Sequence, residues 1–416
     1  MAAPLEGIRV VDVTTNIAGP TLTWILAELG ADVIKIERPG GDEARAMGPL
    51  WNGHGAYFLA INTGKRSAAL DLKDERVRGW VRRLVAGADV FVENFRRGKA
   101  ESLGLGYEQL RQVRPDLVYC SVSAFGEEGP DAAKPGYDSI LQARTGIMSV
   151  TGTPDGPPVR AGVSILDGGT AMWGALAVVS ALFRRSRTGR GQRVGASLFE
   201  TGVGWMNYHL MAFQGTGQVP PRQGSGHNAF APYGAFPCRN GAIVVGISND
   251  RLFQRLCAAL QMPELAADPR FRDNPGRVAN REELDRLLTD RFRQDDAGTW
   301  LARLEAAGVP CGPLRTVPEL LEDPQFHAAA MLVAARHPDI PGLKVPRIPI
   351  RFAEAAEAAE HREIVNGAPL LGQHTWEVLR EAGCGEREME ALWRDGVAWG
   401  LGPPAPNSGP EGAAGG

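Results

Sequence analysis

The chain has 416 residues, 44% of them hydrophobic and 22% charged, with a formal net charge of −3 at pH 7. This length predicts two to three domains, and the composition is typical of a soluble globular protein. The slight negative charge argues against the broad basic surface of a nucleic-acid-binding protein, so we expect no nucleic acid partner. A local basic pocket for a phosphorylated ligand remains compatible with this charge.

The five cysteines are scattered and include no C-x-x-C pair: Cys120, Cys238, Cys257, Cys311 and Cys384. This spacing offers no framework for a metal, and it favours a reducing, cytoplasmic compartment. The N-terminal residues lack the basic region of a secretory signal. The longest apolar run, residues 171–183, is shorter than a membrane span, so we expect no membrane partner.

The first half of the chain alternates strand and helix patterns. An apolar strand at residues 8–13, a helix from Gly19-Pro20 to Gly30 and a strand at 31–36 predict a parallel βαβ unit. The rhythm recurs with strands at 65–73, 88–92, 117–122 and 192–196 and helices at 74–86 and 107–113. The first turn lacks a G-x-G-x-x-G motif, which disfavours a nicotinamide or flavin dinucleotide.

These patterns predict an α/β fold with a doubly wound, Rossmann-like large domain and a smaller α+β domain. The large domain takes residues 1–215 and 330–399, and the small domain takes residues 225–325. A hairpin is expected at Asn240-Gly241 within the small domain. Residues 400–416 are mostly Gly, Pro, Ala and Ser, which predicts a disordered tail.

Several cations follow predicted strands, at the edge where open α/β sheets bind ligands. They are Arg38, Lys73, Arg96, Arg97 and Lys99. Together they predict a nest for phosphate groups. Solvated surface charge would explain each of them separately, and it is the more common fate of a lone arginine such as Arg38.

Residues 162–170, Gly-Val-Ser-Ile-Leu-Asp-Gly-Gly-Thr, precede a long apolar helix pattern and carry one carboxylate, Asp167. One interpretation is that Asp167 is only the N-cap of that helix, and the residues of this stretch alone favour it. The other is that Asp167 is a nucleophile, with backbone N–H groups near Gly168 and Gly169 forming an oxyanion site beside it.

From about residue 5 to residue 399 the chain resembles the class III coenzyme A transferases, which include formyl-CoA:oxalate and succinyl-CoA-dependent dicarboxylate transferases. The resemblance is carried by residues 7–12, 29–38, 65–73, 88–95, 188–192, 308–313 and 370–375. It implies that Asp167, ionised at neutral pH, attacks an acyl-CoA thioester and forms an aspartyl-CoA intermediate. It also implies CoA and acyl-CoA as substrates, no prosthetic group, metal or redox cofactor, and an interlocked homodimer.

The same resemblance implies the residues of the CoA site. They are Ile17, Ala18, Arg38, Leu70, Asp71, Leu72, Lys73, Asn94, Phe95, Arg96, Tyr137 and Asp138. Where family members often carry an arginine after the Asn-Phe loop, this chain has Ser102, and Arg97 or Lys99 is expected to substitute for it. An α-methylacyl-CoA racemase needs a histidine base where this chain has Tyr137, which favours a transferase over that isomerase. A CoA-binding protein without chemistry is the third alternative.

The acceptor acid is inferred from two further comparisons with the family. Some members carry a glutamine at the acyl group where this chain has Ile17, which disfavours oxalate or formate. Residues 222–233 resemble the branch that uses succinyl-CoA and dicarboxylates of roughly four to six carbons. This implies substrate contacts from Gly226, His227 and Asn228, with Arg222 nearby in sequence. The alternative for His227 is a histidine that only orders its own loop.

Overall fold

The computed structural model describes residues 3–352 and 365–400. The chain divides into two compact units. The first takes Met1–Leu141, Val163–Gly204 and the part from Ala330 onward, and the second takes Gln142–Gly162 and Trp205–Ala329. The tail predicted at residues 400–416 lies outside the described residues, except for Gly400.

The first unit is built on a seven-stranded sheet with the order β15-β5-β2-β1-β6-β7-β8. Its strands are β1 (Arg9–Asp12), β2 (Asp32–Glu37), β5 (Arg66–Leu70), β6 (Val90–Glu93), β7 (Val118–Ser123), β8 (Gln192–Ser197) and β15 (Ala398–Trp399). All neighbours pair in parallel except β15, which runs antiparallel to β5. The six parallel strands have the order of a doubly wound sheet, which confirms the predicted α/β class with a parallel sheet.

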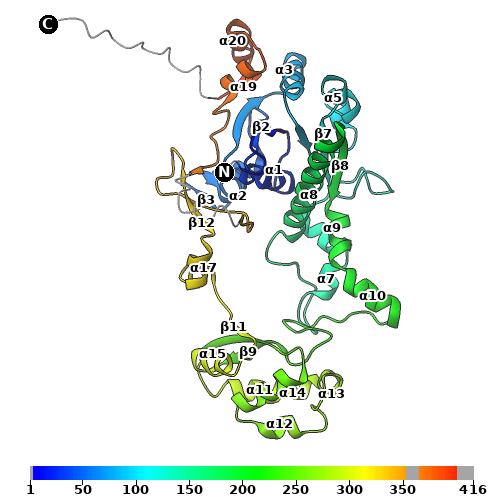
Figure 1. Ribbon diagram of the computed structural model, residues 1–416, viewed down its shortest axis with the longest axis vertical. Helices are drawn as coiled ribbons and strands as arrows, with labels where there is room; N and C mark the ends of the chain where they lie inside the picture. The colour runs from blue at the N-terminus through cyan, green and yellow to red at the C-terminus, as the bar shows by residue number, and fades with distance from the viewer. Residues whose placement is uncertain (1–2, 353–364, 401–416) are drawn as a thin grey trace, which may run out of the picture. The chain divides into compact units, whose positions relative to one another are not determined.

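Helices pack on this sheet from two sides (Figure 1). On one side α1 (Ala18–Glu28) packs against α8 (Ile165–Thr188), which also contacts β7 and β8. On the other side a continuous apolar core joins the strands to α3 (Glu75–Ala86), α5 (Tyr107–Val113), α19 (Thr375–Glu381) and α20 (Glu386–Arg394). A Cβ at Gly174 would lie 2.3 Å from Cδ1 of Leu22, so any side chain there would force Leu22 to shift between α1 and α8.

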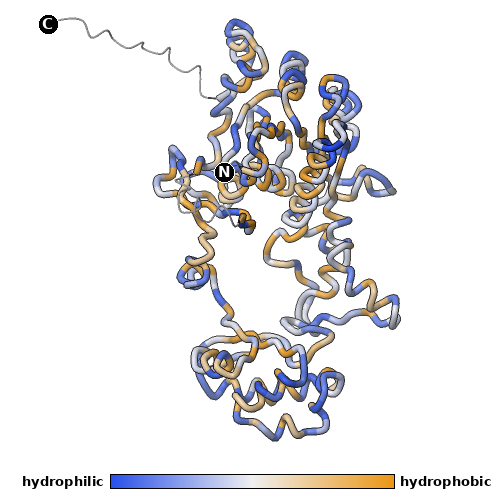
Figure 2. The backbone as a smooth tube through the Cα atoms, viewed as in Figure 1, coloured by the Kyte–Doolittle hydropathy of each residue, from blue (hydrophilic) through white to orange (hydrophobic). Residues whose placement is uncertain are grey.

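The local signals in the sequence explain where these helices begin and end. Asp74 caps α3 by accepting the N–H groups of Arg76 and Val77, and the buried side chains of that helix follow helical spacing. Along α3 the tube alternates between hydrophilic and hydrophobic residues (Figure 2). Gly30 follows α1 with φ +103°, a conformation that favours glycine.

The long helix α8 corrects one expectation. It has 24 residues because the Asp-Gly-Gly-Thr segment and the terminal arginines are helical as well as the apolar run. By length and composition α8 could therefore cross a bilayer, contrary to the estimate from residues 171–183. The core helix of a soluble protein meets the same criterion, and half of the apolar window of α8 is buried inside the protein.

The remaining elements of the first unit are short. They are η1 (Glu43–Ala46), β3 (Leu50–Trp51), β4 (His54–Gly55), α2 (Ala56–Ile61), α4 (Lys99–Ser102), β12 (Leu332–Arg336), β13 (Lys344–Pro346) and β14 (Val365–Asn366). Two further helices, α6 (Asp138–Arg144) and α9 (Leu198–Trp205), run across the boundary between the units.

The second unit has its own core around a three-stranded sheet in the order β11-β10-β9. Its strands are β9 (Tyr233–Cys238), β10 (Gly241–Gly246) and β11 (Cys311–Pro313), and the Asn240-Gly241 hairpin is confirmed. Its helices are α7 (Ile147–Val150), α10 (Asn207–Thr216), α11 (Asp250–Ala259), α12 (Pro263–Ala267), α13 (Asn274–Ala279), α14 (Arg281–Phe292), α15 (Ala297–Ala306), α16 (Val317–Leu321) and α17 (Pro324–Ala329).

The compact units differ in extent from the domains proposed from sequence. Residues 142–162 and 205–215 group with the second unit, whereas the sequence placed them in the large domain. One physical reason is a set of long-range hydrogen bonds. The guanidinium of Arg222 donates to the carbonyls of Thr153 and Gly156, and the N–H of Gly224 donates to the carbonyl of Gly152.

Candidate active site

Asp167 lies in the first turn of α8, three residues after Ser164, which precedes the helix. It is not the N-cap. Oδ2 of Asp138 instead accepts the N–H of Leu166 at 2.7 Å and the N–H of Asp167 at 3.1 Å. The capping interpretation of Asp167 is therefore wrong, because a carboxylate distant in sequence satisfies the helix terminus. The side chain of Asp167 does not have to serve the helix terminus.

The electrostatic setting of Asp167 is unusual for a surface carboxylate. Burial, and to a lesser degree the nearby charge of Asp138, raises the pKa of Asp167 to about 7. A raised pKa gives the protonated form of Asp167 a larger share near neutral pH than an ordinary aspartate has, beside the carboxylate expected from the sequence. A pKa close to the working pH is what acid–base and nucleophilic sites use.

Asp167 opens into a cavity of about 590 Å³ in the first unit. Its walls come from the loops after β1, β6 and β7 and from the start of α8. The strand order reverses between β1 and β6, and in doubly wound sheets ligands bind outside the carboxyl ends of the strands at that point. The topology therefore places Asp167 at the ligand-binding edge of the sheet.

Seven of the site residues expected from sequence meet in this cavity: Ile17, Ala18, Asn94, Phe95, Arg96, Tyr137 and Asp167. Asn94 also ties two of the walls together. Its Oδ1 accepts the N–H of Thr15 at 3.0 Å, and its Nδ2 donates to the carbonyl of Thr15 at 2.8 Å. Asn94 thus fixes the loop after β1 against the loop after β6.

Several expected CoA contacts do not line the cavity. Arg38 donates to the carbonyl of Gly41 at 2.8 Å and pairs with Glu43 at 2.9 Å, while its side chain stays 60% exposed. Leu70 is buried in the core, and Leu72 packs against that core. The carboxylate of Asp71 accepts the N–H of Lys73, whose side chain is exposed.

The cations of the cavity are partly different from those expected. Arg96 and Arg97 line it, and their guanidinium groups form no hydrogen bond or ion pair with any residue in the described ranges. Lys99 and Ser102 do not line it. Lys134 and Arg193 also line it, although no sequence pattern selected them, and they pair with Asp131 and Glu127, respectively. Arg97 therefore fits the substitute role better than Lys99.

The two glycines after Asp167 belong to the body of α8. The N–H of Gly168 donates to the carbonyl of Ser164 at 3.1 Å. An N–H used in this way does not point at an oxyanion, so the geometry does not support Gly168 as a donor. Gly169 is buried within the same helix.

A buried ionic network lies beneath the loop after β1, and sequence reasoning missed it. Nζ of Lys35 contacts Oδ2 of Asp42 at 2.8 Å and donates to the carbonyl of Thr14 at 2.8 Å. Oδ1 of Asp42 accepts the N–H of Asn16 at 3.0 Å, and Asn16 has φ +66°. The network thus fixes the conformation of a cavity wall. Its signal in the sequence was a lysine inside an otherwise apolar strand.

A second lysine completes this network. Nζ of Lys65 donates to Asp12 at 3.3 Å and to the hydroxyl of Thr23 at 2.8 Å. Burial alone would raise the pKa of Asp12, but Lys65 and Lys35 outweigh it and lower that pKa. For Lys65 burial dominates and lowers the pKa to about 8, against the opposite effect of Asp12.

The lid residues expected to contact substrate lie in the second unit. Nδ1 of His227 accepts the N–H of Ala229 at 3.1 Å, which fits the interpretation that this histidine orders its own loop. Arg222 is engaged with backbone carbonyls, as described above. Gly226 and Asn228 line a cavity of about 1040 Å³ in that unit, where Oδ1 of Asn228 is buried without a hydrogen-bond partner among the described residues.

The sequence matches CoA-transferase family III over residues 5–375. It is 37% identical over 380 residues to succinyl-CoA:glutarate CoA-transferase of Mus musculus, covering 91% of this chain and 86% of that protein. It is 40% identical over 374 residues to acetyl-CoA:oxalate CoA-transferase of Acetobacter aceti, covering 89% and 93%.

A solved structure gives the same result at the level of the fold. A CAIB/BAIF family protein from Brucella suis superimposes with a TM-score of 0.81 at 39% identity, covering 92% of this chain and 100% of that one. The family match, the similar sequences and the similar structure each cover most of the chain and all point to the same family. The chain therefore belongs to CoA-transferase family III and is a class III CoA-transferase.

Proposed function

We propose that this enzyme transfers CoA from succinyl-CoA to a dicarboxylic acid of roughly four to six carbons, through an aspartyl-CoA thioester at Asp167. The observation that carries the proposal is the position of Asp167. Its half-buried carboxyl lines the same cavity as the guanidinium groups of Arg96 and Arg97, which have no hydrogen-bond or ion-pair partner in the described part of the chain. CoA transfer needs two parts. One is a set of cations that can bind the phosphates of CoA, and the other is a carboxylate that can attack a thioester.

The proposed reaction conserves every group. A carboxylate oxygen of Asp167 attacks the thioester carbonyl, the C–S bond breaks, and CoA thiolate leaves a mixed anhydride on the enzyme. The thiolate then attacks the aspartyl carbonyl and releases the original acid. The acceptor carboxylate attacks this aspartyl thioester, thiolate leaves again, and its attack on the acyl carbonyl of the new anhydride restores free Asp167. Each attack begins from an anion, so only the deprotonated form of Asp167 starts the cycle.

The geometry assigns a positioning role to Asp138. Its carboxylate accepts the N–H groups of Leu166 and of Asp167 itself, in the first turn of α8, which holds the backbone that carries the nucleophile. Its negative charge also helps to keep the pKa of Asp167 high. A carboxylate that is a stronger base is the better nucleophile once it is deprotonated.

The first prediction on this site concerns the phosphates of CoA. We expect Arg97→Ala to weaken CoA binding by roughly tenfold or more, because a charge-assisted hydrogen bond is lost. Arg38→Ala should change binding less, because Arg38 points its guanidinium at Gly41 and Glu43. Isothermal titration with CoA measures both variants. A larger loss in Arg38→Ala than in Arg97→Ala would show that the cavity is not where the phosphates bind.

The acceptor acid provides the test of the proposed function. With succinyl-CoA as donor, we expect kcat/KM for glutarate to exceed that for the monocarboxylate of equal length by at least about 100-fold. A site that binds a second carboxylate leaves buried donors unpaired when that group is missing. Oxalate belongs in the panel, because one relative is named for it. Equal rates with both classes of acid would refute the dicarboxylate assignment, while CoA transfer itself would stand.

We also propose that two copies of the chain associate. The face of α8 turned away from the sheet carries Met172, Trp173, Leu176 and Phe183, each more than half exposed. Apolar patches of this kind commonly mark protein interfaces. We expect sedimentation equilibrium to give twice the chain mass for the wild type and a smaller mass for Trp173→Glu. A wild-type monomer at micromolar concentration would contradict the proposal, and binding to lipid vesicles instead would assign this face to a membrane.

A further inference from the structure

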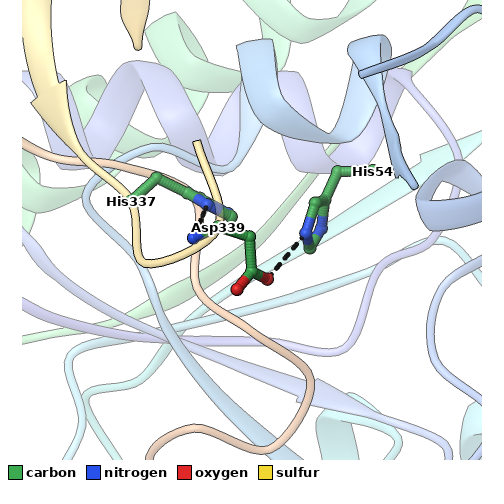
Figure 3. A group of neighbouring side chains, drawn as sticks. All are labelled: His54, His337 and Asp339. Atoms are coloured by element: carbon green, nitrogen blue, oxygen red, sulfur yellow. Dashed lines mark hydrogen bonds and ion pairs between the residues drawn. The ribbon is translucent and has the colours of Figure 1, made fainter. Parts of the chain in front are cut away.

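Two histidines and an aspartate meet in the first unit, at a place the transfer reaction does not use. His54 lies on β4, while His337 and Asp339 lie in the turn that follows β12 (Figure 3). Each residue offers a ligand atom, and these atoms all lie within 4.8 Å of one another. None of the three residues lines the cavity that contains Asp167.

The backbone on both sides of this cluster is held in place. A small apolar core contains Phe58 and Leu59, just after β4, together with Ala335 and Ile340 from the region of the turn. The two segments are almost 300 residues apart in sequence, yet they share this core. The cluster is therefore not a chance meeting of mobile loops.

Hydrogen bonds orient the three side chains further. Nε2 of His54 lies 2.9 Å from Oδ2 of Asp339, and the rings of His54 and His337 meet edge to face with centroids 4.7 Å apart. The side-chain amide of Asn52 donates to the backbone carbonyl of Asp339 at 2.9 Å. The backbone N–H of Asp339 donates to Nδ1 of His337 at 3.2 Å. Figure 3 shows the ring of His54 directed at the carboxylate of Asp339 and the ring of His337 directed at the backbone N–H of Asp339.

We propose that His54, His337 and Asp339 bind one divalent transition metal ion, with Zn²⁺ as the best fit. Two imidazole nitrogens and one carboxylate oxygen form a ligand set that zinc accepts, with water in the fourth tetrahedral position. Mg²⁺ and Ca²⁺ prefer oxygen ligands alone and fit this set poorly.

Coordination requires the three ligand atoms, which now lie within 4.8 Å of one another, to adjust their spacing. Ligands about 2.1 Å from a tetrahedral ion lie about 3.4 Å from one another. The contact of His54 with Asp339 at 2.9 Å must therefore open by about half an ångström, which the 49% exposed side chain of Asp339 allows. Each neutral imidazole keeps its single proton on the nitrogen that does not coordinate. For His337 this ends the long hydrogen bond to the backbone of Asp339, whichever nitrogen binds the metal.

The ion would join the β3–β4 hairpin to the segment that returns to the first unit after Ala330. Binding to the folded chain alone stabilises it by mass action. Because the cluster is outside the cavity of Asp167, the ion would stabilise the first unit without taking part in CoA transfer.

The experiment uses the full chain without an affinity tag, first treated with a chelator. Equilibrium dialysis against ZnCl₂ with atomic emission should give about one tightly bound zinc per chain. The melting temperature should rise with Zn²⁺ and stay unchanged with Mg²⁺. Both effects should be lost in His337→Gln and in Asp339→Asn. They should persist in the matched control His327→Gln, which alters an exposed histidine on α17.

The half-exposed Asp339 makes Asp339→Asn a decisive variant even where His337→Gln fails to fold. Bound Co²⁺ provides a second readout, because nitrogen and oxygen ligands around it give a visible spectrum that changes when one ligand is removed. A chain that binds no zinc in the micromolar range overturns the proposal. So does a chain whose zinc content is the same in Asp339→Asn, His337→Gln and the wild type.

Discussion

Replacement of Asp167 by alanine should lower kcat/KM for CoA transfer by roughly 10³-fold or more, because it removes the carboxyl group that is proposed to carry first the acyl group and then CoA. The affinity for CoA should change little, since the cations that line the cavity are untouched. Stopped assays with succinyl-CoA and glutarate measure the first quantity, and titration calorimetry measures the second. Transfer at the wild-type rate in this variant would end the assignment of Asp167.

Covalent trapping tests directly whether Asp167 is the nucleophile. Wild-type enzyme incubated with acyl-CoA should gain the mass of CoA less one water, and borohydride or hydroxylamine should modify a peptide that contains Asp167. Asp167→Ala should gain no mass under the same conditions. Asp167→Glu, which keeps the carboxylate but moves it by one methylene, is the matched control for geometry. A trapped adduct on any other residue would require a different nucleophile.

The stability of Asp167→Ala provides a test that does not depend on turnover. The folded chain raises the pKa of Asp167 from 3.8 to about 7, so the folded state binds this proton more tightly than the unfolded state. Its contribution to stability is fully present below about pH 3.8 and is lost as the pH rises through about 7. The lost part is at most about 4 kcal/mol, and partial exposure reduces it. The variant should therefore gain stability relative to wild type as the pH rises from about 4 to about 7, measured by urea unfolding.

Loss of Lys35 should be the most damaging single change to the fold of the site. Lys35→Met leaves the carboxylate of Asp42 buried without its counter-charge, and we expect about 3–5 kcal/mol of destabilisation. The loop from Thr14 to Asn16 should lose its conformation as well, because both Lys35 and Asp42 hold it. Urea unfolding at pH 7 measures the free energy, and KM for CoA reports on the loop.

Two further variants serve as controls for this experiment. Lys344→Met removes an exposed lysine from β13 and should change the free energy of unfolding by no more than about 0.5 kcal/mol. The double variant Lys35→Met/Asp42→Asn should recover part of the loss, since no uncompensated charge is left buried. A destabilisation by Lys35→Met that equals that of Lys344→Met would mean that the pair is solvated and not structural.

The parallel sheet could be predicted because its signals are local. Apolar β-branched runs, the Asp74 cap and the glycine that follows α1 each act over a few residues, and all agree with the structure. The antiparallel strand β15 was missed, since two residues at the far end of the chain carry no such pattern. The same limit applies to residues 142–162, whose grouping with the second unit depends on bonds from Arg222 and Gly224.

The residues of the candidate site likewise fall into those that the sequence predicted and those that only the structure revealed. Asn94, Phe95, Arg96 and Tyr137 meet Asp167 as expected, because carboxyl ends of parallel strands share one edge of the sheet. Arg38 also follows a parallel strand, but contacts with Gly41 and Glu43 turn its guanidinium to them. Arg193 lines the cavity because β8 pairs with β7, and this pairing joins segments that are about 70 residues apart in the sequence.

The sequence by itself determined the α/β class and the family, and it singled out Asp167 as the proposed nucleophile, since each rests on residue identity and short-range pattern. The tertiary structure alone decided that Asp138 caps α8, that Asp167 has a pKa of about 7 and that buried lysines support the first loop. Only the tertiary structure shows that His54 and His337 lie close together. The reason is that desolvation, ion pairing and capping by a distant side chain depend on which groups fold into contact, and no local pattern encodes those distances.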